Sequence, residues 1–268
     1  MKINESLKKS LCWAYERSPF YKAWYDEHGF SVESFIESDN DVELPVIKCE
    51  EYIQKSFFDL ITIPMSAVAE ICTAVYQNHR FLKARSAHET SADVERTKTY
   101  LADKGVNRSS IVALDGLSSM ENSEIYLALS MLGANVFYLP ENADWREKRL
   151  LLKSMGADTI VFHSSALEKY FPEGDNNHLE TLFRAIIISE GCRKDVKRNL
   201  AAYEERLGVP LYEIVSLSFT TALIDFYRSE NGEYVPRDGL LIRRVDDGII
   251  LTDTDAVTLP LIGLKTEW

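Results

Sequence analysis

The sequence has little of what nucleic-acid-binding or membrane-spanning proteins need. Its 268 residues include 30 lysines and arginines against 42 aspartates and glutamates, a net charge of −12, with no block of basic residues. Because phosphate neutralisation requires clustered basic side chains, we expect no nucleic-acid partner. No apolar run approaches the roughly 20 residues that cross a bilayer, and none follows the polar N-terminus. The sequence therefore predicts neither a membrane association nor a signal peptide.

Cysteines and the usual ligand-binding motifs are also scarce. The four cysteines, at positions 12, 49, 72 and 192, form no CxxC pair. This spacing excludes a zinc ribbon and argues against a disulfide scaffold, so we expect a cytoplasmic protein. GxGxxG, GxxxxGK(S/T), GxSxG and HExxH are absent, and the five histidines show no metal-ligand spacing. No metal site is predicted.

What the chain does contain is an alternation of apolar runs and helical patterns in its middle. Apolar runs predict buried strands at residues 111–114, 135–139, 159–162 and 185–188. Helices are predicted over residues 122–132, 144–154 and 193–207, the first of them opened by a capping-box spacing between Ser118 and Glu121. Such alternation is typical of βαβ units, and therefore of a parallel sheet flanked by helices.

The two ends of the chain have different patterns. Near the N-terminus, helices are predicted over residues 3–16, 21–27 and 50–55, with Pro19 separating the first two. After Pro210 the pattern predicts short strands and no helix, with runs at residues 211–215, 220–227, 239–243, 248–251 and 258–264. We therefore expect an α/β fold of layered βαβ sheets over residues 1–209, with a small β-rich subdomain over residues 210–268.

A few polar residues occupy positions that suit chemistry. His163 follows an apolar strand, where the active sites of open α/β sheets gather, although many strand ends carry a polar residue without function. Cys192 is predicted beside a helix N-terminus and two basic residues, which would favour a reactive thiolate. Asp246, Asp253 and Asp255 lie in β-rich turns, and we interpret them as turn formers.

Segments spread along the chain match, in order, the motifs of one enzyme family. They are SPFYK (18–22) with DEHG (26–29), LPVIK (44–48), DKGV (103–106), GLSS (116–119), LGANV (132–136), GVPLYEI (208–214), and GIILT (248–252) with LPLI (259–262). This series resembles the adenylate-forming enzymes of the phenylacetate–CoA ligase type, over nearly the whole chain. The resemblance implies the fold of their N-terminal domain, with βαβ layers followed by a β-rich subdomain.

The chain departs from this family at the positions that handle ATP. The family's glycine-rich phosphate loop is expected just after Cys72, but residues 73–80 contain no glycine. Glycines let backbone N–H groups wrap a phosphate, which branched and bulky residues do not do cheaply. Phe219 stands where the family has a glutamate that contacts magnesium and nucleotide, and Trp268 where it has the ribose-binding aspartate. We expect the family's C-terminal domain, which carries a lysine that contacts the reacting carboxylate, to be absent.

The resemblance also implies two remnant sites. The remnant nucleotide region comprises Thr73, Tyr76, Asn78, His79, Arg80, Glu190, Gly191 and Ser218. The remnant acyl pocket comprises Gly116, Ser118, Ser119, Tyr138, Ser216 and Phe219, and would hold a small hydrophobic acid, narrowed by Tyr138 and Phe219. No catalytic residue is assigned.

Three functions remain open from the sequence. The first is a non-catalytic relative of these ligases without a cofactor, because losing several contacts to ATP leaves little adenylation chemistry. It would bind a partner protein or a small carboxylic acid. The second is a CoA ligase subunit that uses ATP and magnesium and is completed by a separate C-terminal domain. Its nucleotide loop would be rebuilt from Asn78, His79, Arg80, Lys83 and Arg85, a run that a solvated β-hairpin also explains. The third is an unrelated thiol-dependent activity at Cys192.

A partner surface is predicted as well. If the β-rich end lacks the covering domain of its relatives, apolar side chains near Trp268 would be left exposed. We expect a partner protein or a second copy of the chain to bind there.

Overall fold

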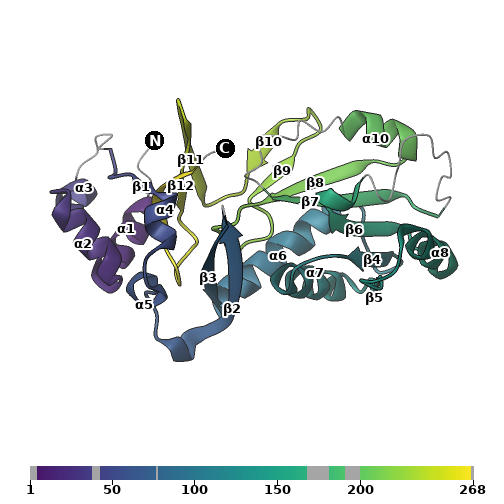
Figure 1. Ribbon diagram of the computed structural model, residues 1–268, viewed down its shortest axis with the longest axis horizontal. Coiled ribbons are helices and arrows are strands. Elements are labelled where there is room, and N and C mark those ends of the chain that lie inside the picture. Colours follow the sequence, from purple (N-terminus) through teal and green to yellow (C-terminus); the bar gives the residue numbers. More distant parts are fainter. Residues whose placement is uncertain (1–4, 38–42, 77, 168–180, 191–199, 267–268) are drawn as a thin grey trace. The chain divides into compact units, whose positions relative to one another are not determined.

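A computed structural model describes residues 5–37, 43–76, 78–167, 181–190 and 200–266 (Figure 1). Its contacts divide the chain into two compact units. The first unit holds the described residues up to Ser91, together with Leu217–Ala222 and those from Pro236 onward, and the second holds Ala92–Ser216 and Leu223–Val235. None of the helices in the described ranges is both long and apolar enough to cross a membrane.

The second unit is built on a seven-stranded sheet. Its strands, in spatial order, are β10 (Tyr234–Pro236), β9 (Phe226–Arg228), β8 (Leu211–Ser216), β7 (Arg184–Glu190), β6 (Thr159–His163), β4 (Ile111–Asp115) and β5 (Asn135–Tyr138). Strands β5, β4, β6, β7 and β8 pair in parallel, and β9 joins β8 antiparallel. The predicted parallel sheet is confirmed.

Two predictions about strands near residue 210 need correction. Strand β8 was expected among the antiparallel strands of the β-rich end, but it is the fifth parallel strand of this sheet, with Ala185 opposite Leu211. The predicted run at residues 220–227 forms a strand only from Phe226 onward. The neighbouring residues Leu223 and Ile224 are both buried, which an alternating strand with one exposed face does not allow.

Helices cover both faces of the seven-stranded sheet. They are α6 (Ala87–Asp103), α7 (Ser119–Leu132), α8 (Trp145–Met155) and α10 (Leu200–Leu207). Alternate strand residues point to opposite faces. Val112 and Leu114 pack with residues of α6 and α7, whereas Ala113 packs with residues of α8 and α10. The predicted capping box is present, with Ser118 and Glu121 each accepting a backbone N–H of the other at the start of α7.

The first unit combines short helices with a four-stranded sheet. The helices are α1 (Glu5–Arg17), α2 (Pro19–Glu27), α3 (Val32–Glu37), α4 (Cys49–Ile53) and α5 (Phe57–Leu60), and the sheet has the order β1 (Ile47–Lys48), β13 (Leu261–Thr266), β12 (Gly248–Asp253), β11 (Leu240–Val245). Pro19 separates α1 from α2, as predicted, but α2 begins at Pro19 itself and not at residue 21, and Ser18 caps it. The buried Tyr21 hydroxyl donates to the Pro260 carbonyl at 2.7 Å and accepts from Ile262 N at 3.0 Å, which fastens α2 to the sheet.

Candidate functional site

The stretch that the family resemblance assigns to a phosphate loop is a tight β-hairpin in the first unit (Figure 1). Strand β2 (Val68–Tyr76) pairs antiparallel with β3 (His79–Ser86), from Val68 opposite Ser86 to Tyr76 opposite His79. Tyr76 and His79 are the pair nearest the connection between the two strands. Asn78 has φ +69°, a left-handed conformation that asparagine tolerates better than most residues. The backbone N–H groups here serve a strand ladder instead of forming an open loop.

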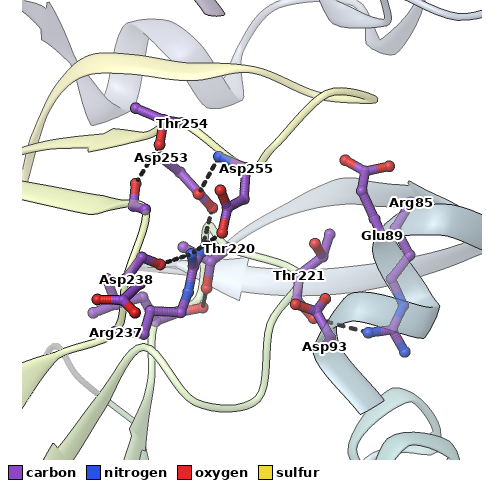
Figure 2. A network of polar contacts seen from close by, with 12 residues as sticks. Arg85, Glu89, Asp93, Thr220, Thr221, Arg237, Asp238, Asp253, Thr254 and Asp255 are labelled. Carbon is purple, nitrogen blue, oxygen red and sulfur yellow. Dashed lines mark hydrogen bonds and ion pairs between the residues drawn. The ribbon is translucent and has the colours of Figure 1, made fainter. Parts of the chain in front are cut away.

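The basic side chains of β3 differ in what they contact. Arg85 is fully buried and binds Glu70, with Nε and Nη2 at 2.9 and 2.8 Å from Oε2. Its Nη1 also donates to the Thr221 carbonyl at 3.4 Å (Figure 2). Lys83 Nζ donates to the Thr220 carbonyl at 2.7 Å. Two of the basic residues considered for a rebuilt nucleotide loop therefore hold residues 220–221 in place.

Phe219 fills the position of the family's metal-contacting glutamate with a buried aromatic ring. Its ring centroid lies 4.6 Å from that of Tyr76 and 5.9 Å from that of Phe81. The Tyr76 hydroxyl is in turn 3.3 Å from Thr266 Oγ1. An ionised carboxylate here would be costly in free energy, because the surrounding aromatic rings cannot replace the hydrogen bonds that water gives it. We call Tyr76, Phe81 and Phe219 the aromatic cluster.

Glu89 ties the end of this hairpin to the loop before β13. It accepts hydrogen bonds from Ser86 N at 2.7 Å, Val257 N at 2.7 Å and Thr258 N at 2.9 Å, and from the Thr258 hydroxyl. A nearly buried carboxylate with this many donors is fully satisfied. Glu89 therefore acts as a structural anchor of the first unit.

The aspartates of the β-rich end surround an arginine (Figure 2). Buried Arg237 binds Asp253 and lies 3.4 Å from Asp255, whose backbone N–H donates to Asp253 at 3.1 Å. Gly239 has φ +82°, and a Cβ there would lie 2.5 Å from the Asp255 carboxylate, so the turn requires glycine. Asp246 lies in the turn between β11 and β12. Within the described ranges, no three His, Cys, Asp or Glu side chains are grouped to hold a metal ion.

The second unit has a switch point in its sheet. From β4 the chain crosses to β5 on one side, and then to β6 on the other side of β4. Ligands of open α/β sheets bind at the carboxyl ends of strands at such points. Asp115 ends β4, His163 ends β6, and Glu121 lies in the first turn of α7. We call this group, with Lys148 of α8, the strand-end cluster.

The strand-end cluster contains an ion pair and a histidine–carboxylate contact. Lys148 Nζ lies 2.7 Å from Asp115 Oδ1, with side chains 13% and 6% exposed. His163 Nε2 lies 3.4 Å from Glu121 Oε2, which also accepts from Ser118 N at 2.7 Å. Burial by itself would raise the pKa of Glu121, but the bonds to His163 and Ser118 outweigh it and hold that pKa below its ordinary value of 4.5. The Glu121 carboxylate is therefore ionised at neutral pH.

Sequence reasoning found part of this cluster. His163 was singled out for its place after an apolar strand, and it lies at that strand's end. Asp115 and Lys148 were missed. The signal for Asp115 was present, since it directly follows the apolar run 111–114. Lys148 carries no such signal, because only the packing of α8 brings it to Asp115.

The structure divides the other predicted site residues between the two units. Thr73, Tyr76, Asn78, His79, Arg80, Ser218 and Phe219 belong to the first unit, and Gly116, Ser118, Ser119, Tyr138, Glu190 and Ser216 to the second. Tyr138 is exposed, with its ring 6.4 Å from that of Tyr126, and Ser216 ends β8. Gly191, Cys192 and Trp268 lie outside the described residues. The two remnant sites therefore stay predictions.

The chain is similar to known proteins in its fold. No protein-family model matches the chain, and no curated protein matches its sequence. Among solved structures, an open conformation of 2-hydroxyisobutyryl-CoA ligase in complex with 2-HIB-AMP and CoA is similar, with a TM-score of 0.77 at 18% identity, over 97% of this chain and 66% of that chain. The postadenylation state of that ligase with 2-HIB-AMP gives 0.78 at 18% identity, over 97% and 60%. O-succinylbenzoate coenzyme A synthetase from Bacillus subtilis, in complex with AMP, gives 0.54 at 10% identity, over 85% and 47%.

These likenesses concern the fold. The chain spans 60–66% of the length of the 2-hydroxyisobutyryl-CoA ligase structures and is covered almost completely by them. The α/β architecture predicted from the sequence is confirmed, whereas the narrower assignment to the phenylacetate–CoA ligase type stays a prediction. The chain has the fold of the N-terminal domain of adenylate-forming enzymes.

Proposed function

We propose that this chain is a non-catalytic relative of the adenylate-forming CoA ligases, and that it acts by binding a small carboxylic acid or a partner protein. The observation that carries the proposal is the aromatic cluster. Phe219 is buried against Tyr76 and Phe81 at the position where the family resemblance implies an acidic contact to magnesium and nucleotide.

The electrostatics of the hairpin support this proposal. Forming an acyl-adenylate requires donors that cradle the triphosphate and cations that meet the charge on the transferred phosphate. In the β2–β3 hairpin the backbone is paired as a ladder, and Lys83 and Arg85 donate to the carbonyls of Thr220 and Thr221. Losing one such transition-state contact costs about 3 kcal/mol. The loss of several would leave adenylation close to the uncatalysed level.

The strand-end cluster supports the binding half of the proposal. Lys148 and His163 are positioned at the switch point with partly exposed side chains, 13% and 21%. A lysine ammonium has three donor hydrogens, so Lys148 can keep its bond to Asp115 and still donate to an incoming carboxylate. A small acid bound here would need no nucleotide.

The proposal is tested by measuring whether the chain binds ATP and magnesium. We expect no change of Tm with ATP·Mg, and ATP–pyrophosphate exchange at the level of a buffer blank for every carboxylic acid tried. A nucleotide present at 100-fold above its Kd would stabilise the fold by about 2.7 kcal/mol, which a thermal shift detects easily. A saturable shift, or exchange above the blank, would overturn the proposal.

One observation favours the ligase subunit as a second candidate. His79 and Arg80 are exposed beside the hairpin turn, and no described carboxylate forms an ion pair with them, so they are free to meet a phosphate. Under this candidate, ATP·Mg raises the Tm of the wild type and Arg80→Met removes that rise. Arg146→Met, at an exposed arginine of α8, is the matched control and keeps it. No rise in the wild type contradicts this candidate.

A further inference from the structure

The outer face of α7 is apolar and without charge. Of the two carboxylates of this helix, Glu124 is buried and accepts from Thr97 Oγ1 at 2.6 Å, and Glu121 belongs to the strand-end cluster. From Asn122 to Leu132 no other residue of the helix is charged. The exposed large side chains are Tyr126, Leu127 and Met131, the last 57% exposed.

Strand β5 extends this apolar surface. Tyr138, at its end, is 53% exposed, and its ring stacks on that of Tyr126 with the planes 25° apart. The outer edge of β5 pairs with no strand in the described part of the chain, and α7 packs beside it. We call Tyr126, Leu127, Met131 and Tyr138 the α7 patch.

Such a face is unusual for a surface helix, as α8 on the opposite face of the same sheet shows. The solvent side of α8 carries two exposed large apolar residues, Leu150 and Met155, but they lie among the exposed charged residues Arg146, Glu147 and Lys153. Helix α7 already buries Ile125 and Leu129 against the sheet, so with Tyr126, Leu127 and Met131 it carries large apolar side chains on its outer side as well. A surface helix normally has charged or polar residues on the side opposite the core.

We propose that the α7 patch is the interface of a homodimer, in which a second copy of this chain binds through the same patch. The proposal does not depend on the proposed function, because it uses none of the residues assigned to ATP or acid binding except Tyr138. A two-fold symmetric contact places equivalent residues against one another, so the interface must be complementary to itself. An uncharged apolar helix face with stacked tyrosines fulfils that condition.

The net charge of the chain makes the α7 patch the place where a second copy can bind. The four side chains of the patch expose roughly 400 Å² per copy, about half of the ~800 Å² that each partner contributes to a stable interface. The flanking serines and the free edge of β5 can supply the remainder. Each copy has a net charge of −12, so two copies repel unless they meet where neither carries charge. The α7 patch is such a place.

Sedimentation equilibrium of the full chain tests the proposal. We expect the wild type to have twice the chain mass of 30.6 kDa at micromolar concentration. Leu127→Glu/Met131→Glu should weaken dimerisation at least about 100-fold, because it buries like charges against one another. Leu150→Glu on α8 is the control: Leu150 is 68% exposed and outside the patch, so this variant should remain a dimer.

Each other outcome overturns the proposal. The proposal is wrong if the wild type stays monomeric at every concentration. It is also wrong if the double variant remains dimeric or if the Leu150→Glu variant dissociates. If the double variant does not fold, hydrogen exchange of the wild type decides instead. The amides of residues 126–138 should exchange more slowly in concentrated than in dilute protein, and equal rates would contradict an interface there.

Discussion

The two regions that a ligand would be expected to use differ in how their charged groups are employed. In the first unit, Lys83 and Arg85 of the hairpin are bound to the carbonyls of residues 220–221, and the space beside them holds the aromatic cluster. In the second unit, the strand-end cluster keeps Lys148 and His163 partly exposed. The same residue types thus serve the fold in one region and remain accessible to ligands in the other.

Burial explains the difference. A fully buried cation such as Arg85 must keep its partners, since an unpaired charge is very costly away from water. Lys148 and His163 are partly exposed, so a ligand can reach them while they keep their carboxylate partners. We therefore expect substitutions in the hairpin to affect mainly stability. Substitutions in the strand-end cluster should affect stability less and ligand binding more.

The largest effect is expected for Phe219→Ala. Removing a buried ring that packs against two others should lower the free energy of unfolding by about 3–5 kcal/mol, measured by urea denaturation. Phe58→Ala is the matched control, because Phe58 lies in the same unit and is 67% exposed, and it should change stability by less than about 0.5 kcal/mol. Equal effects of the two variants would mean that the aromatic cluster does not form.

Arg85→Met should destabilise the first unit by about 3 kcal/mol. The substitution removes the donor to the Thr221 carbonyl and the arginine partner of Glu70. Breaking a buried ion pair costs about 3–5 kcal/mol. Because Glu70 is partly exposed, we expect the smaller value. Arg80→Met, on the same strand, should stay within about 0.5 kcal/mol of wild type in the same urea titration. If Arg85→Met unfolds at the same urea concentration as the wild type, the hairpin cations do not stabilise the fold and the two regions do not differ in this respect.

Lys148→Met should cost about 2 kcal/mol in the second unit, because Asp115 is left nearly buried without this partner while some water still reaches it. Lys153→Met, at an exposed position of the same helix, serves as the reference and should be close to neutral. If a carboxylic acid raises the Tm of the wild type, Lys148→Met should reduce that rise and Lys153→Met should not. The opposite pattern would move the acid site away from the strand-end cluster.

The smallest effect concerns the pH dependence contributed by Glu121. Since its pKa is lowered by folding, its contribution to stability is complete above its ordinary pKa of 4.5 and is lost as the pH falls through the lower folded value. The Tm deficit of Glu121→Gln relative to wild type should therefore be largest near neutral pH and shrink on acidification, as followed by calorimetry. Glu141→Gln, an exposed glutamate of the same unit, should show no such trend. A deficit that grows in acid would reverse the assigned direction.

The sequence predicted the parallel sheet and its helices well because those signals are local. Apolar runs of four or five residues mark β4, β6 and β7, and the spacing of Ser118 and Glu121 marks the start of α7. The place of β8 was mistaken, since a short strand looks alike from the sequence whether its neighbours run parallel or antiparallel. Its pairing with β7 depends on contacts across the sheet.

The sequence by itself determined the order of the elements, because helix caps and strand periodicity depend on neighbouring residues. It also determined that residues 73–80 lack the backbone freedom that glycine would give them. Only the tertiary structure decided that Phe219 packs on Tyr76 and that Lys148 reaches Asp115, 33 residues away. Contacts between distant residues form when whole elements pack together. Their geometry therefore cannot be predicted from any single segment of the chain.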